Sequence, residues 1–79
     1  MGNKEKLQQI FVDVLNSSIE QMPYLQLKES ENWDSVGHIA LIAEIENVFD
    51  INLETDDMFN ITSFDSAVKI LETNYNIKF

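Results

Sequence analysis

The sequence predicts an all-α protein: a small bundle of three main helices and one short helix, with a long loop between the first two. Three segments repeat apolar residues at three- and four-residue spacing, which is the period of one helix face. No segment alternates apolar and polar residues for long enough to predict a strand. We therefore expect one domain, residues 1–79, in which the helices share a single core.

The first predicted helix covers residues 4–17, and a long connection follows it. Pro23 cannot continue a helix, and no period persists from residue 19 to residue 34. A connection of this length in a small domain is usually functional or packed by its own side chains. The apolar face of the first helix consists of Leu7, Ile10, Phe11, Val14 and Leu15.

The second predicted helix, residues 35–49, has the strongest signal, and Asp34 or Ser35 is available as its N-cap. At about 100° per residue its apolar side chains fall into two arcs. We expect one arc to face the core and the other, next to Ser35, to dock a partner. Alternatively, the first helix or the long loop covers the second arc. The core arc contains Leu41, Ile42, Ile45, Val48 and Phe49, and the second arc contains Val36, Ile39, Ala40 and Ala43.

Two further helices are predicted after residue 50. Residues 55–59 offer one acidic turn, and residues 63–74 form the last main helix, which Thr62 or Ser63 caps. The buried stripe of this last helix contains Phe64, Ala67, Val68, Ile70 and Leu71.

The composition restricts the classes of partner. The chain has 14 Asp and Glu residues against 5 Lys, with a formal charge of −9, so nucleic acid and anionic membranes are disfavoured and basic proteins are favoured. No apolar run is long enough to span a membrane, and no signal peptide is evident. We expect a cytoplasmic monomer. Because the chain has no Cys, any thiol chemistry would have to be imported.

Enzymatic and metal-binding interpretations of the sequence are weak. Asp34, Ser35 and His38 lie too close along one helix to form a Ser-His-Asp relay, and no nucleophile elbow surrounds the serine. We therefore expect no enzyme activity. His38 is the only histidine, which excludes a multi-histidine centre. The segment after Asp50 fails as a calcium loop because Thr55 replaces the required Gly, so no metal site is expected.

Asp34-Ser35-Val36 opens a helix that closes with Glu46-Asn47-Val48-Phe49-Asp50-Ile51. This pattern resembles the acyl carrier protein family, and the resemblance covers most of the chain. It implies that Ser35, next to the motif residue Asp34, carries a covalent 4′-phosphopantetheine arm, added from coenzyme A by a phosphopantetheinyl transferase with magnesium. The arm would hold acyl or aminoacyl groups as thioesters. A phosphate at a helix start is favoured by the unpaired N–H groups and the helix dipole.

The resemblance also implies a partner-binding surface beside Ser35, which basic patches on loading ligases, acyltransferases or synthases would meet. Ala40 and Val48 stand where carriers of fatty acid synthesis often have Glu. This departure counts against general fatty acid synthesis and favours a dedicated free-standing carrier, with the aminoacyl or D-alanyl carriers as close relatives. The sequence leaves open whether the pathway is fatty acid, polyketide or secondary metabolite biosynthesis. The alternative is an unmodified carrier-like adaptor that docks a fixed partner through its second helix. The implied surface contains the apolar residues Val36, Ile39 and Ala43 and the acidic residues Glu46, Asp50, Asp56 and Asp57.

Overall fold

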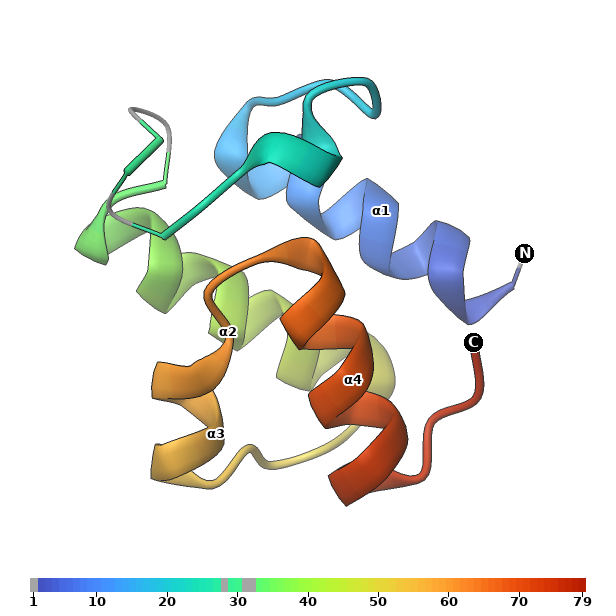
Figure 1. Ribbon diagram of the computed structural model, residues 1–79. Helices are drawn as coiled ribbons and strands as arrows, with labels where there is room; N and C mark the ends of the chain where they lie inside the picture. Colours follow the sequence, from blue (N-terminus) through green and yellow to red (C-terminus); the bar gives the residue numbers. More distant parts are fainter. Residues whose placement is uncertain (1, 28, 31–32) are drawn as a thin grey trace.

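Helices and the turns between them make up the computed structural model, which describes residues 2–27, 29–30 and 33–79 (Figure 1). No strand occurs in these described ranges, and the predicted all-α class is confirmed. A short 3₁₀ helix, η1, interrupts the loop before α2 and was not predicted. The elements are α1 (Asn3–Leu15), η1 (Met22–Tyr24), α2 (Ser35–Phe49), α3 (Thr55–Asn60) and α4 (Phe64–Tyr75).

The three longer helices end on a residue in the left-handed region. Asn16, Asp50 and Asn76 have φ values of 51°, 54° and 56°, and their N–H groups bond back to the preceding helix. Asn and Asp tolerate this conformation better than other residues with a Cβ atom. For this reason α1 ends at Leu15, two residues before the predicted end. At the start of α4 the cap is Ser63: its hydroxyl accepts from the backbone N–H of Ser66, and the Ser66 hydroxyl accepts from the backbone N–H of Ser63.

The core lies where α1 packs along α2 and α4 crosses in front of them (Figure 1). Phe11 stands at its centre, completely buried, with ring centroids 5.3 Å from Trp33 and 5.2 Å from Phe64. The loop residue Trp33 is the largest fully buried side chain of the protein. The loop before α2 is therefore attached to the core by the residue that stands two positions before Ser35.

The core arc predicted for α2 is correct at Leu41, Ile42 and Ile45, which are buried, and wrong at Val48. Val48 is 38% exposed because it lies on the groove between α1 and α2 instead of under α4. Phe49 is only partly buried, and its ring centroid lies 6.3 Å from that of Phe79. The last residue of the chain thus covers the end of α2.

The start of α1 and the segment after α4 lie near each other (Figure 1). The side-chain amide of Asn3 donates a 2.9 Å hydrogen bond to the carbonyl oxygen of Lys78. Among the helices of the described residues, none is both long and apolar enough to cross a membrane.

Candidate functional site

Ser35 is the first residue of α2, and its neighbour Asp34 is the N-cap. One carboxylate oxygen of Asp34 accepts a 2.8 Å hydrogen bond from the backbone N–H of Gly37. The cap position that the sequence left open between Asp34 and Ser35 therefore belongs to Asp34. Ser35 is exposed, and the hydroxyl stands at the end of the helix where unpaired N–H groups and the dipole favour an anion.

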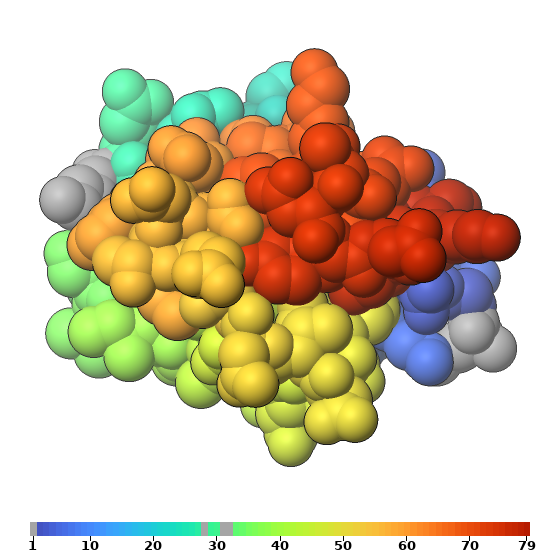
Figure 2. Space-filling view, turned by 90° about the horizontal axis from the view of Figure 1, so that it is seen from below, coloured from blue at the N-terminus to red at the C-terminus, as the bar shows by residue number. Residues whose placement is uncertain are grey.

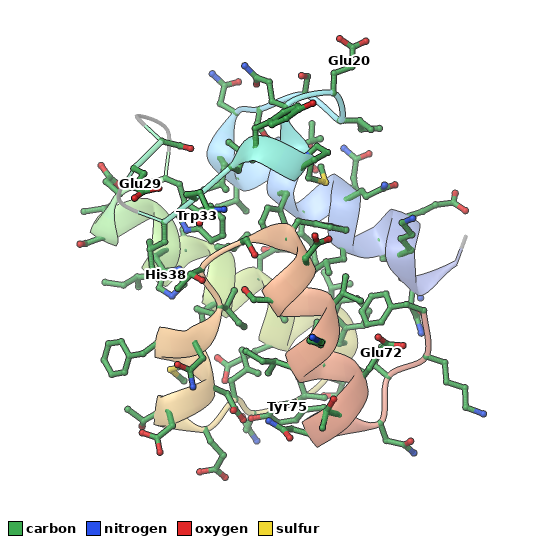
Figure 3. The ribbon with its side chains drawn as sticks, viewed as in Figure 1. Glu20, Glu29, Trp33, His38, Glu72 and Tyr75 are labelled. Carbon is green, nitrogen blue, oxygen red and sulfur yellow. The ribbon has the colours of Figure 1, made fainter. Side chains whose placement is uncertain are left out.

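His38, one turn after Ser35, is buried between the loop and α3 (Figure 3). Its Nδ1 accepts a 3.1 Å hydrogen bond from the indole N–H of Trp33, and its Nε2 lies 2.7 Å from the carbonyl oxygen of Met58. Because indole can only donate and a carbonyl can only accept, these partners require the neutral tautomer with its hydrogen on Nε2. The ring joins the loop, α2 and α3 at one point.

The hydrogen bonds of His38 disfavour a role for it as the base that activates Ser35. Both ring nitrogens of His38 have partners other than Ser35, so in this conformation the imidazole presents no free nitrogen to the hydroxyl. The Asp34 carboxylate is engaged by the backbone of Gly37. In this conformation neither His38 nor Asp34 is placed to activate the Ser35 hydroxyl as a nucleophile.

An apolar surface lies beside Ser35, formed by α2 and α3. Val36 is 76% exposed, Ile39 is 71% exposed and Phe59 of α3 is 69% exposed. Ala40 and Ala43 are also exposed, so neither α1 nor the loop covers the second arc of α2. Figure 2 shows the first turns of α2 (green) and α3 (light orange) side by side on one face. We refer to Val36, Ile39, Ala43 and Phe59 as the α2–α3 apolar surface.

Two hollows lie along this surface, and His38, Ile39 and Phe59 line both. The one nearer the start of α2 is also lined by Leu27, Ser35 and Thr62. The other is also lined by Ile42, Ala43, Glu46 and Met58. Sequence analysis missed the contributions of Phe59, Met58 and Leu27. Only the apolar character of Phe59 within an acidic turn could have drawn attention to it.

The four acidic residues expected on the partner surface differ in their surroundings. Asp50 and Asp56 are exposed, at the end of α2 and in the first turn of α3. Glu46 accepts a 2.8 Å hydrogen bond from the backbone N–H of Leu53, which fixes the turn after α2. Asp57 accepts from the Tyr75 hydroxyl at 2.7 Å and from the Asn74 side chain at 3.0 Å. Glu46 and Asp57 therefore have structural partners, whereas Asp50 and Asp56 face solvent.

Tyr75 of α4 is hydrogen-bonded to the start of α3, and its pKa is raised. Its hydroxyl accepts a 2.7 Å hydrogen bond from the backbone N–H of Glu54 and donates to Asp57. Desolvation of the phenol raises the pKa of Tyr75 above 10.0, and the Asp57 carboxylate adds to this effect, although the Glu54 N–H opposes it. The neutral phenol is therefore the form that fits this junction.

Within the part of the chain that the structure describes, no three acidic or histidine side chains come together as a metal site. Comparison of the chain with protein-family models, with curated proteins and with solved structures gave no match.

Proposed function

We propose that the chain is a discrete carrier protein that holds acyl or aminoacyl groups as thioesters on a 4′-phosphopantetheine arm attached to Ser35. The observation that carries this proposal is the position of Ser35: it is exposed at the first residue of α2, while Asp34 performs the capping. A phosphodiester on the Ser35 Oγ would stand at the positive end of the helix dipole.

The surroundings of Ser35 fit the chemistry of such an arm. Ser35 itself lines a largely apolar hollow with Leu27, Ile39 and Phe59. The arm supplies the thiol that the Cys-free chain lacks, and its length would let one cargo reach the active sites of several enzymes. In this proposal the chain catalyses no reaction; it presents the cargo to enzymes that load, extend or remove it.

Partner enzymes would dock on the α2–α3 apolar surface and the exposed carboxylates beside it. Lys and Arg side chains on the partner would complement Asp50 and Asp56, which are exposed. Electrostatic complementarity of this kind raises the association rate more than the affinity and weakens as salt increases. Fast, salt-sensitive and short-lived complexes suit a carrier that must visit several enzymes.

The central experiment is modification of the purified protein by coenzyme A and a broad-specificity phosphopantetheinyl transferase with magnesium, followed by intact mass measurement. We expect a mass gain of one arm in the wild type and in Ser18→Ala, which changes an exposed loop serine. Ser35→Ala should gain no mass. The proposal fails if the wild type gains no arm, or if Ser35→Ala gains one.

The docking surface is tested by the rate of the same reaction. Ile39→Glu should slow modification strongly, whereas Ile19→Glu, at a 60% exposed position in the loop, should not. Asp56→Asn should also slow it more than Glu20→Gln, since Glu20 lies at the opposite end of the molecule from α3 (Figure 3). Because all four positions are exposed, these variants should fold, with stability changes within about 0.5 kcal/mol.

One observation favours a second candidate, an unmodified adaptor: the α2–α3 apolar surface is exposed in the unmodified chain. Complementation of a deletion in the native host separates the two candidates. A carrier loses function with both Ser35→Ala and Ile39→Glu. An adaptor retains function with Ser35→Ala and loses it with Ile39→Glu.

A further inference from the structure

The buried ring of His38 makes two hydrogen bonds: it is the acceptor in one and the donor in the other. Nδ1 accepts from the Trp33 indole, and Nε2 faces the Met58 carbonyl oxygen, which lies 20 residues further along the chain. The Trp33 and His38 ring centroids are 6.0 Å apart. The His38 imidazole thus bonds to the Trp33 indole, in the loop before Ser35, through one ring nitrogen, and to the Met58 carbonyl of α3 through the other.

Protonation of His38 affects these two bonds differently. The neutral ring has one acceptor and one donor, whereas the imidazolium has two donors. The added hydrogen on Nδ1 would point at the indole N–H of Trp33, which can only donate. The Nε2–H bond to the Met58 carbonyl is compatible with either form. The Trp33 bond must therefore break while the bond to α3 persists.

Among the residues that the structure describes, the carboxylates on the elements around the ring have other hydrogen-bond partners or face solvent. Glu46 lines the same hollow but accepts from Leu53, and Asp34 of the preceding turn accepts from Gly37. On α3, Asp57 accepts from Tyr75 and Asn74. On the loop side, Glu29 is exposed. Of these described carboxylates, none shares a hydrogen bond with His38.

We propose that His38 is a pH-sensitive latch: its neutral form ties the Trp33 indole to the start of α2, and its protonated form releases that indole while staying bonded to Met58. Trp33 stands two residues before Ser35, so the latch determines whether its indole is held beside the candidate modification site. This inference does not depend on whether Ser35 carries an arm.

The latch can be observed directly because the chain has one histidine and one tryptophan. ¹⁵N NMR of the full-length protein at about pH 8 should show the His38 hydrogen on Nε2 and none on Nδ1. As the pH is lowered from about 8 to about 5, the Trp33 indole N–H signal should shift in step with protonation of His38 and exchange with water several-fold faster. The backbone N–H signals of α3 should change little.

His38→Asn is the matched control, because its amide oxygen can still accept from the indole but cannot titrate. In this variant the indole signal should be independent of pH over the same range. The proposal is overturned if the ring carries its hydrogen on Nδ1 at pH 8, if the indole signal is unchanged while the ring protonates, or if His38→Asn keeps the same response. Loss of the helical circular dichroism signal in that pH range would also overturn it. If His38→Asn does not fold, the wild-type titration decides alone.

Discussion

Asp34 and Ser35 have different roles at the start of α2. A helix start needs an acceptor for its unpaired N–H groups, and Ser and Asp are both good N-caps. Here the Asp34 carboxylate accepts from Gly37, and the Ser35 hydroxyl stands one position further on, inside the helix. A serine that acted as the cap would lose that contact on modification. Under the proposed function, a group attached to the Ser35 hydroxyl would leave the Asp34 cap in place.

Because only Asp34 acts as the cap, substitutions at Asp34 and Ser35 should lower the free energy of unfolding by different amounts. Asp34→Ala should lower the free energy of unfolding by about 1 kcal/mol, because the bond to Gly37 is lost. Asp34→Asn keeps an acceptor and should cost less. Ser35→Ala should change stability by no more than about 0.5 kcal/mol. Urea unfolding of the three variants checks this; an equal loss for Ser35→Ala and Asp34→Ala would show that the serine also caps.

The residues of the candidate site differ in how far the sequence reveals them. Ser35, Val36 and Ile39 could be identified because they lie on one helix, where spacing determines which side chains share a face. The exposed Phe59 and the carbonyl of Met58 come to the site from α3. Their positions depend on tertiary packing, and the hydrogen-bond partner of a backbone carbonyl leaves no pattern in the sequence.

At the scale of elements, helix starts were easier to predict than helix ends. The start of α2 has a capping residue followed by good helix formers, and its predicted bounds are correct. The end of α1 depends on Asn16 adopting a left-handed conformation, which Asn permits but does not require. η1 depends on burial of Met22 beneath the loop, which no local period indicates.

The junction of α3 and α4 should weaken at alkaline pH. The folded state raises the pKa of Tyr75 above 10.0, so the stabilising effect of the neutral phenol is complete below pH 10.0 and is lost as the pH rises through the folded-state pKa. Thermal unfolding followed from pH 8 upward should show this decline. Tyr75→Phe should be less stable than the wild type at pH 8 but should show a smaller alkaline decline.

Tyr24 provides the control for this prediction. It is 80% exposed in η1, so Tyr24→Phe should retain the alkaline decline of the wild type. If Tyr24→Phe and Tyr75→Phe responded alike, the junction would not be the source of the effect.

Two phenylalanines on different elements should differ in their contributions to stability. Phe11→Ala removes a fully buried ring in contact with Trp33 and Phe64 and should cost about 3 to 5 kcal/mol. Phe49→Ala should cost less, because Phe49 is partly buried and packs on the chain end at Phe79. Urea midpoints of the two variants check the ranking. A larger loss for Phe49→Ala would mean that packing at the end of α2 contributes more to stability than the aromatic contacts of Phe11 on α1.

For the whole molecule, we expect charge to oppose folding more than it supports it. The 14 acidic residues face only 5 Lys, and the compact state brings them together. Some carboxylates are favourably placed, such as Asp65 in the first turn of α4. Such helix-dipole contributions are each about 0.3 to 1 kcal/mol and are also screened by salt. Because the excess of like charge is large, repulsion should be the greater effect.

The melting temperature should therefore rise as NaCl increases from about 0.01 M to about 0.1 M, where the Debye length falls from about 30 Å to about 10 Å. Replacing Glu20 and Glu72 with Gln removes two negative charges from exposed positions in the loop and on α4 (Figure 3). The double variant should melt higher at low salt and respond less to NaCl, because less repulsion remains to be screened. Differential scanning calorimetry at pH 7 measures both quantities. A melting temperature that fell with salt would mean that attractive contacts between charges and helix ends outweigh the repulsion among the carboxylates.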